Sequence, residues 1–141
     1  MSEWVEVAVC GAHMSGLPLN HQLLGLGGQL VARTKTAPHY RLYRLSGFEP
    51  PRPGLVRVHD PGGAVEVEVW RLPVEHYGKL VVAVPAPLCI GTLDLQDSRA
   101  VQGFLCESYA TEQALDITSL GGWRNYLASQ HGDDLNSNHN S

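Results

Sequence analysis

The sequence predicts an α+β domain, built as a small mixed β-barrel or curved sheet with two or three short helices. Apolar and polar residues alternate in several short runs, most clearly in AVEVEVWRL at residues 64–72. Turns rich in glycine, proline and aspartate separate these runs, and helical periodicity is confined to short segments. We therefore expect one domain over residues 1–129. Residues 130–141 are polar and are predicted to form a disordered tail.

The N-terminal half is predicted to be mainly strands. An apolar run, Trp4 to Cys10, gives the first strand, and a turn of small residues follows at 11–16. Pro18 near a first turn and the leucines behind it predict a short helix over 17–26, which two glycines end. A proline-rich connection lies at 48–53, where prolines cannot donate ladder hydrogen bonds. Further strands are expected at residues 29–36, 40–45, 54–59 and 64–72.

The C-terminal half is predicted to combine short helices with a hairpin. Pro73 at a first turn predicts a short helix over 73–82, and the prolines of PAPLCIG keep 85–91 extended. Residues 90–95 and 100–107 are expected to pair around a turn at 97–98. The segment 111–116 is left unassigned, and WRNYLAS at 123–129 is predicted to be a short amphipathic helix.

Composition excludes several classes of partner. The 141 residues include 43% hydrophobic residues, a globular value, and carry a formal net charge of -4. No basic run is present, which argues against a nucleic-acid partner. No apolar stretch is long enough to span a bilayer, and the N-terminus lacks the pattern of a signal peptide. Three widely spaced cysteines indicate free thiols, so we expect a cytoplasmic protein without a membrane partner.

The loop after the first strand, within VAVCGAHMSGLPLN at 7–20, is the predicted binding site. Gly11, Ala12, Ser15 and Gly16 leave backbone N–H groups uncovered, and we assign the N–H groups of Ser15, Gly16 and Leu17, with the Ser15 hydroxyl, as donors to an anion. His13 has a reference pKa of about 6.5 and can take up or release a proton near neutral pH. It either transfers a proton, contacts the ligand or only ties down the loop. Asn20 either fixes the loop or contacts the ligand.

Other candidates come from later segments. Tyr40 is predicted to line the pocket, and Ile90, Gly91 and Thr92 to form its opposite wall, unless that segment is simply a bulged strand entrance. Glu66 and Glu68 share one strand face, where two carboxylates either act as acid and base or are simply solvated. The histidines show no metal-ligand spacing, so we predict no metal and no cofactor.

Several blocks together resemble a known family. They are GAHMSGLPLNHQL, TAPHYRLYRL, RPGLVRV, EVEVWRLP, PAPLCIGT, GFLCE and GGWRNYL. In this order, from about Val7 to Leu127, they are similar to the C-terminal domain of allophanate hydrolase, which has the γ-glutamylcyclotransferase-like fold. The amidase domain of that family, with its Ser-Ser-Lys set, has no counterpart in this sequence. We therefore expect a stand-alone relative of the second domain.

The resemblance implies a role in urea and allophanate breakdown. The family's C-terminal domain is similar to one that decarboxylates N-carboxycarbamate to carbamate, so the expected activity is that of a decarboxylase and the expected partner a small dianionic substrate. Such chemistry needs donors for two carboxylates and one acid, for which His13 is the catalytic candidate. A separate amidase partner and a homo-oligomer are left open.

Two alternatives to decarboxylation follow from the same resemblance. One is a γ-glutamylamine cyclotransferase, whose general base is a glutamate in the order aromatic, Glu, Gly. Here the sequence reads Glu75-His76-Tyr77-Gly78, so Tyr77 stands directly before the glycine. The other is a non-enzymatic domain that binds an amidase or holds an oligomer together.

Overall fold

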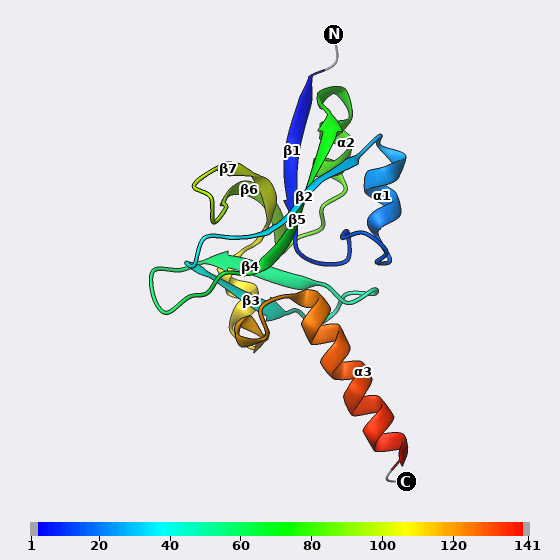
Figure 1. Ribbon diagram of the computed structural model, residues 1–141, viewed down its shortest axis with the longest axis vertical. Coiled ribbons are helices and arrows are strands. Elements are labelled where there is room, and N and C mark those ends of the chain that lie inside the picture. The colour runs from blue at the N-terminus through cyan, green and yellow to red at the C-terminus, as the bar shows by residue number, and fades with distance from the viewer. Residues whose placement is uncertain (1–2, 140–141) are drawn as a thin grey trace.

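The computed structural model describes residues 3–139, with side chains described up to residue 131. Eight strands and three α-helices make up this part of the chain (Figure 1). The strands are β1 (Trp4–Val9), β2 (Gln29–Lys35), β3 (Tyr40–Arg44), β4 (Pro53–Arg57), β5 (Glu66–Pro73), β6 (Leu88–Asp94), β7 (Ala100–Cys106) and β8 (Leu115–Asp116). The helices are α1 (Asn20–Gly25), α2 (Val74–Val82) and α3 (Trp123–His139), with short 3-10 turns at Ser108–Thr111 and Thr118–Leu120.

The strands form two curved sheets, so the predicted α+β class is confirmed. The larger sheet has the order β2-β5-β1-β7-β6, and the smaller has the order β4-β3-β8. All neighbouring pairs are antiparallel except β1 and β7, which are parallel, with Val7 opposite Gln102 and Ala8 opposite Gly103. β1 therefore lies in the middle of the larger sheet, and the loop that follows it starts from a strand that is paired on both sides.

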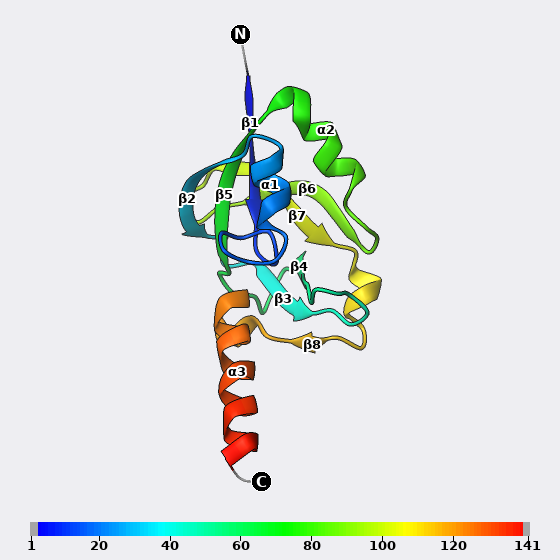
Figure 2. The same cartoon turned by 90° about the vertical axis from the view of Figure 1, so that its right-hand side faces the viewer.

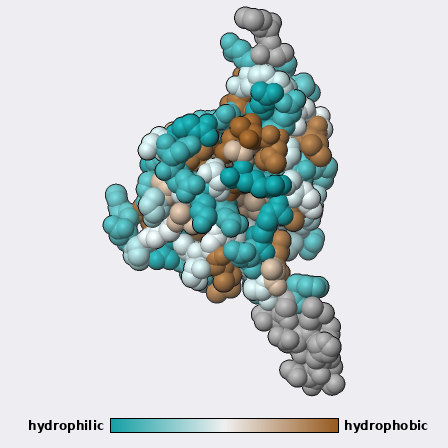
Figure 3. Space-filling view, viewed as in Figure 1, coloured by the Kyte–Doolittle hydropathy of each residue, from teal (hydrophilic) through white to brown (hydrophobic). Residues whose placement is uncertain are grey.

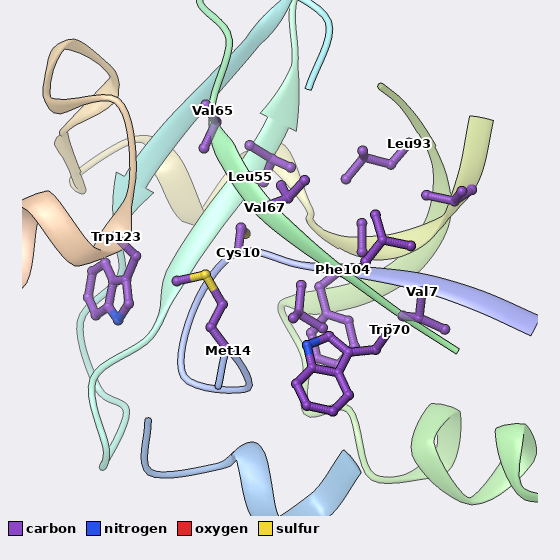
Figure 4. Close-up of a cluster of buried hydrophobic side chains, with 14 of the residues drawn as sticks. Val7, Cys10, Met14, Leu55, Val65, Val67, Trp70, Leu93, Phe104 and Trp123 are labelled. Atoms are coloured by element: carbon purple, nitrogen blue, oxygen red, sulfur yellow. The ribbon is translucent and has the colours of Figure 1, made fainter. Parts of the chain in front are cut away.

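The larger sheet is covered by the two short helices and by the smaller sheet. Figure 2 shows α1 beside β1 and α2 at the same end of the molecule, whereas α3 projects from the opposite end. The buried cluster between these elements includes the β1 and β5 side chains, Met14 of the loop and Trp123 of α3 (Figure 4). Trp123 and Tyr126 of α3, whose ring centroids are 5.1 Å apart, are both buried in this cluster, and their burial anchors the first turn of α3 on the core.

Three predicted elements need correction. The helix expected over 17–26 is only Asn20–Gly25, because Leu17 and Leu19 N–H groups bond back to Met14 and Ala12 carbonyls and keep the chain in turns. The strand expected from residue 64 begins at Glu66, and both of its faces are largely buried. The last helix begins at Trp123 as predicted but continues to His139 instead of ending at Ser129. Disorder of residues 130–141 in solution stays a prediction.

The surface is mostly polar, with hydrophobic groups over β1, β2 and α1 on the face shown in Figure 3. Leu24 of α1 and Val31 of β2 are among the exposed large apolar residues. Within the described residues, no helix combines the length and apolarity needed to cross a membrane.

Candidate functional site

The loop between β1 and α1 is held by hydrogen bonds of its own backbone and of the Asn20 side chain. Met14 N–H donates to the Gly11 carbonyl at 3.0 Å, and Leu19 N–H donates to the Ala12 carbonyl at 2.8 Å. The Asn20 side chain donates to the His13 carbonyl at 2.8 Å, so Asn20 fixes the loop in this structure. Gly16 takes a φ of 78°, a left-handed conformation that favours glycine. The loop is thus a preformed turn directly after a central strand.

Three consecutive backbone donors of this loop are unused. The N–H groups of Gly11, Ala12 and His13 have no hydrogen-bond partner within the described part of the chain. All three residues are nevertheless buried. Buried backbone N–H groups are almost always paired with protein, water or ligand, so three unpaired ones in succession mark a place for an acceptor.

These donors border a small cavity. Besides the three loop residues, its walls come from Val9, Cys10, Arg52, Pro53, Leu55, Leu88 and Phe104. The cavity has a volume of about 10 Å³, which is enough for roughly one water molecule. Its walls therefore combine backbone donors and one cation with apolar side chains.

Arg52 is the cation of this cavity. It lies half-buried in the proline-rich connection between β3 and β4, with its guanidinium 5.6 Å from the centre of the Phe48 ring. Among the described residues no carboxylate forms an ion pair with it. A half-buried guanidinium without a counter-ion beside unpaired N–H groups gives a strongly positive site that suits an anion.

His13 is the titratable side chain of the cavity wall. Its residue is 3% exposed, and its ring packs on Phe104 with 4.8 Å between centroids. Nε2 lies 2.7 Å from Gln22 Oε1. An amide oxygen only accepts, so Nε2 carries the hydrogen and the lone pair lies on Nδ1. No side-chain or backbone donor within the described residues bonds to Nδ1.

The protonation state of His13 follows from its burial. Loss of solvent lowers the pKa of His13 to about 4, and nearby Arg52 also lowers it, whereas the hydrogen bond that Nε2 donates to Gln22 acts in the opposite direction. The ring is therefore neutral at pH 7 when the cavity is empty of anions. This differs from the proton available at neutral pH that the sequence suggested.

No carboxylate lines this cavity among the described residues. Glu75, the glutamate nearest to the cyclotransferase pattern in sequence, is exposed on α2 and is not part of the cavity wall. Tyr77, which stands before Gly78, donates instead to Gln102 at 3.1 Å. The cavity thus lacks the general base that cyclisation of a γ-glutamylamine requires.

The other side of the loop is occupied by Glu68 of β5. Its carboxylate is 2% exposed and accepts from Ser15 N–H at 2.7 Å and the Ser15 hydroxyl at 3.0 Å. Trp70 Nε1, Arg33 and Arg124 donate to the same carboxylate. The alternative that Glu68 is simply solvated is therefore wrong. The Ser15 donors, predicted to bind substrate, are engaged by this internal carboxylate.

A larger cavity of about 390 Å³ adjoins Glu68. Its lining includes Met14, Arg33, Lys35, Glu66 and Arg124. The loop therefore separates two cavities, with His13 facing the smaller one and Met14 the larger one.

The remaining predicted residues lie away from the small cavity. Tyr40 is fully buried in β3, and its hydroxyl accepts from Arg57 and from Asp94 N–H. Ile90, Gly91 and Thr92 lie in β6, an edge strand, paired with Phe104, Gly103 and Gln102. The neighbouring Leu88 and Phe104 line the cavity instead. Gly16 and Leu17 are in the loop but not in the cavity wall. Their roles as substrate contacts stay predictions.

Sequence reasoning missed Arg52, Phe104 and Leu88. The one signal for Arg52 was its position as a lone cation between prolines in FEPPRP, a segment that cannot join a ladder. No group of three or more histidine, cysteine, aspartate or glutamate side chains is arranged to hold a metal ion within the described residues.

The fold and the loop after its central strand define a γ-glutamylcyclotransferase-like domain. Comparison with known proteins identifies the family within this fold. A family model of the allophanate hydrolase C-terminal domain matches residues 5–128. This chain therefore belongs to the allophanate hydrolase C-terminal domain family.

Three relatives show how widely the domain is used. Urea amidolyase of Saccharomyces cerevisiae is 39% identical over 127 residues, which cover 87% of this chain and 7% of that protein. The S177A allophanate hydrolase of Kluyveromyces lactis is 36% identical with a TM-score of 0.85, over 89% of this chain and 21% of the other. A uropathogenic Escherichia coli-specific protein is 38% identical with a TM-score of 0.83, over 89% of this chain and 97% of the other. This chain thus spans only a small part of its curated relatives.

Proposed function

We propose that this domain binds a small dicarboxylate beside His13 and decarboxylates N-carboxycarbamate to carbamate in the breakdown of allophanate. The observation that carries the proposal is the set of unpaired N–H groups at Gly11, Ala12 and His13 next to the unpaired Arg52. These groups suit a carboxylate. The urea amidolyase and allophanate hydrolase relatives favour a substrate from urea or allophanate breakdown.

The reaction needs one bond to break and one proton to move. The C–N bond of the N-carboxycarbamate dianion breaks, the electron pair stays on nitrogen, and carbon dioxide leaves. A proton added to that nitrogen gives carbamate. The three N–H groups and Arg52 hold the carboxylate that is retained, while the apolar wall at Leu88 and Phe104 favours the departing group as it loses its charge.

His13 supplies the proton in this scheme. A dianion in the cavity favours the charged imidazolium and raises the pKa of His13 from its low value in the free site. Nε2 is held by Gln22, so Nδ1 takes up the proton on substrate binding and gives it to the nitrogen as the C–N bond breaks. This proton transfer returns His13 to the neutral form.

Binding also requires the cavity to open. A volume of about 10 Å³ does not admit a dicarboxylate. Arg52 is the half-buried side chain of the wall, and it lies on a connection outside any strand. In our proposal the Arg52 side chain moves outward and closes again over the carboxylate.

The test supplies the unstable substrate in situ from allophanate with a separate amidase and follows the initial rate of carbon dioxide release. We expect the protein to accelerate release and His13→Asn to abolish the acceleration. His21→Asn is the matched control, because exposed His21 bonds only to the Pro18 carbonyl. Equal rates with and without the protein would rule out the proposed activity, and full activity of His13→Asn would rule out the proton transfer.

Malonate is a stable dicarboxylate of similar size, and its binding can be measured by calorimetry. We expect His13 to take up a proton when malonate binds near pH 7, so that the measured heat depends on the ionisation enthalpy of the buffer. Binding without proton uptake would separate the dicarboxylate site from the proposed acid. The cyclotransferase alternative has no comparable support, because no carboxylate lines the cavity in the described chain.

A further inference from the structure

Glu68 is the most heavily contacted carboxylate described in the fold. Oε1 accepts from Ser15 N–H at 2.7 Å and from Trp70 Nε1 at 3.0 Å. Oε2 accepts from the Ser15 hydroxyl at 3.0 Å, Arg33 Nε at 3.3 Å and Arg124 at 3.0 Å. These hydrogen bonds lower the pKa of Glu68 although its burial acts in the opposite direction, so the carboxylate stays charged.

The donors come from parts of the chain that are distant in sequence. Ser15 belongs to the β1–α1 loop, Arg33 to β2, Trp70 to β5 and Arg124 to α3. Arg124 also donates to the Ser15 carbonyl at 2.7 Å. Both backbone groups of Ser15 are therefore held from outside the loop, by Glu68 on the N–H and by Arg124 on the carbonyl.

Ser15 lies two residues after His13, the last of the three unpaired donors. Preorganised backbone donors bind an anion well only when they are held in place before the anion arrives. The internal ties of the loop fix its shape, whereas Glu68 and Arg124 fix its position on the sheet and on α3.

We infer that Glu68 is a positioning residue: it holds Ser15 so that His13 and the N–H groups before it face the small cavity. This inference rests on the proposed function for its effect on ligand binding, but the positioning itself is measurable in the free protein. Glu68 does not line the small cavity and contacts no substrate in our scheme.

Glu68→Gln is the informative substitution because it keeps the size of the side chain. The amide oxygen can still accept from Ser15 N–H and Trp70. The amide nitrogen replaces Oε2 and points donors at Arg33 and Arg124, which have only donors to offer. Glu66→Gln is the matched control: Glu66 lies on the same strand and lines the same larger cavity, and it has no ion pair among the described residues.

The first experiment uses the free protein. We expect Glu68→Gln to speed hydrogen exchange of the Ser15 amide at least about tenfold and to move the pKa of His13, followed by its ring proton resonances, from about 4 toward 6.5 as water reaches the ring. Glu66→Gln should leave both unchanged. A Glu68→Gln protein with lower thermal stability but unaltered Ser15 exchange and His13 titration would overturn the inference, because the role of Glu68 would then be structural only.

The second experiment measures malonate affinity by calorimetry. Glu68→Gln should bind malonate about tenfold more weakly than the wild-type protein, whereas Glu66→Gln should bind it with wild-type affinity. If Glu68→Gln speeds Ser15 exchange but leaves malonate affinity at the wild-type value, the link between loop positioning and ligand binding would be overturned. Failure of the wild-type protein to bind malonate would refute the proposed function, while the exchange and titration results would still decide the positioning.

Arg124→Gln provides a second variant in case Glu68→Gln does not fold. Arg124 is partly exposed on α3, so its loss leaves a smaller disturbance in the core. We expect Arg124→Gln to change the Ser15 exchange rate and the pKa of His13 in the same directions as Glu68→Gln, but by smaller amounts. No change in either would count against the inference.

Discussion

The two sides of the β1–α1 loop differ in one respect: on one side a carboxylate of the fold engages the donors of Ser15, and on the other three backbone donors are unused. Glu68 accepts from Ser15, Trp70 and two arginines on the first side. On the second side Gly11, Ala12 and His13 N–H groups and Arg52 have no acceptor within the described chain. The same loop therefore carries a completed anion site and an open one.

The difference separates donors that hold the fold together from donors that are free in the described chain. The buried Glu68 carboxylate accepts hydrogen bonds from five donor groups and thereby joins distant parts of the fold. These donors are engaged and are not free to bind a ligand. Buried donors without a protein acceptor cost stability unless water or a ligand accepts from them. If the side with free donors is a binding site, substitutions there weaken ligand binding, whereas substitutions on the Glu68 side disturb the loop itself.

The largest expected effect concerns the neutral form of buried His13. The unfolded chain takes up a proton at this residue below about pH 6.5, whereas the folded chain does so only near pH 4. The contribution of His13 to stability is therefore complete above pH 6.5 and is lost as the pH falls from 6.5 to 4, by about 3 kcal/mol in total.

Urea denaturation between pH 4 and pH 7.5 measures this effect. His13→Asn should show a flatter dependence of the unfolding free energy on pH over that interval. His59→Asn is the control of unchanged slope, because His59 is exposed and is not among the groups that shift the pKa of His13. A slope in His13→Asn equal to that of wild type would mean that His13 does not titrate as its burial requires.

Removal of the cation on the open side is the next test. Arg52→Gln should weaken malonate binding about 30-fold, corresponding to roughly 2 kcal/mol, because a carboxylate in the cavity then lacks its one charged partner. Arg44→Gln is the control, since Arg44 is exposed at the end of β3 in the same hairpin. Calorimetry at low salt gives both affinities. Equal affinities of the two variants would place the anion elsewhere.

The difference between the two sides of the loop could not be predicted from the sequence, because the residues that create it are far apart along the chain. Alternating runs such as the one in β5 and the small-residue turn after β1 gave the fold class and the position of the loop. The burial of Glu68 depends on Ser15 and Arg124, which are 53 and 56 positions away. Period-two alternation alone placed Glu68 on an exposed face, whereas α3 and the loop cover that face.

The site was only partly predictable for the same reason. His13 was found because a titratable residue in a small-residue loop is visible in the sequence. Arg52 was missed because a proline-rich connection has no periodicity that indicates which way a side chain points. The sequence also did not indicate which backbone N–H groups of the loop are free, since the partner that engages Ser15 comes from β5. Only the three-dimensional structure separates engaged donors from free ones.

The close approach of the loop to β4 gives a further prediction. A Cβ added to Gly11 would lie 2.4 Å from Pro53 Cδ, in a place where the loop and the start of β4 meet. Gly11→Ala should therefore lower the unfolding free energy by about 2 kcal/mol and displace the donors at the cavity. Urea denaturation checks the stability and calorimetry the malonate affinity. Wild-type values of both would show that the two segments separate easily.

The smallest effect is expected for a glycine-to-alanine substitution far from the loop, the counterpart of Gly11→Ala. Gly78 lies in α2, is exposed, and has no atom within 4 Å of the position that a Cβ would take. Gly78→Ala should raise the unfolding free energy by about 0.5–1 kcal/mol, because alanine loses less backbone freedom in a helix. Malonate affinity should stay unchanged, since α2 contributes no residue to the small cavity. A change in affinity would show that α2 is coupled to the open side of the loop, and the functional difference between the two sides would then extend beyond the loop itself.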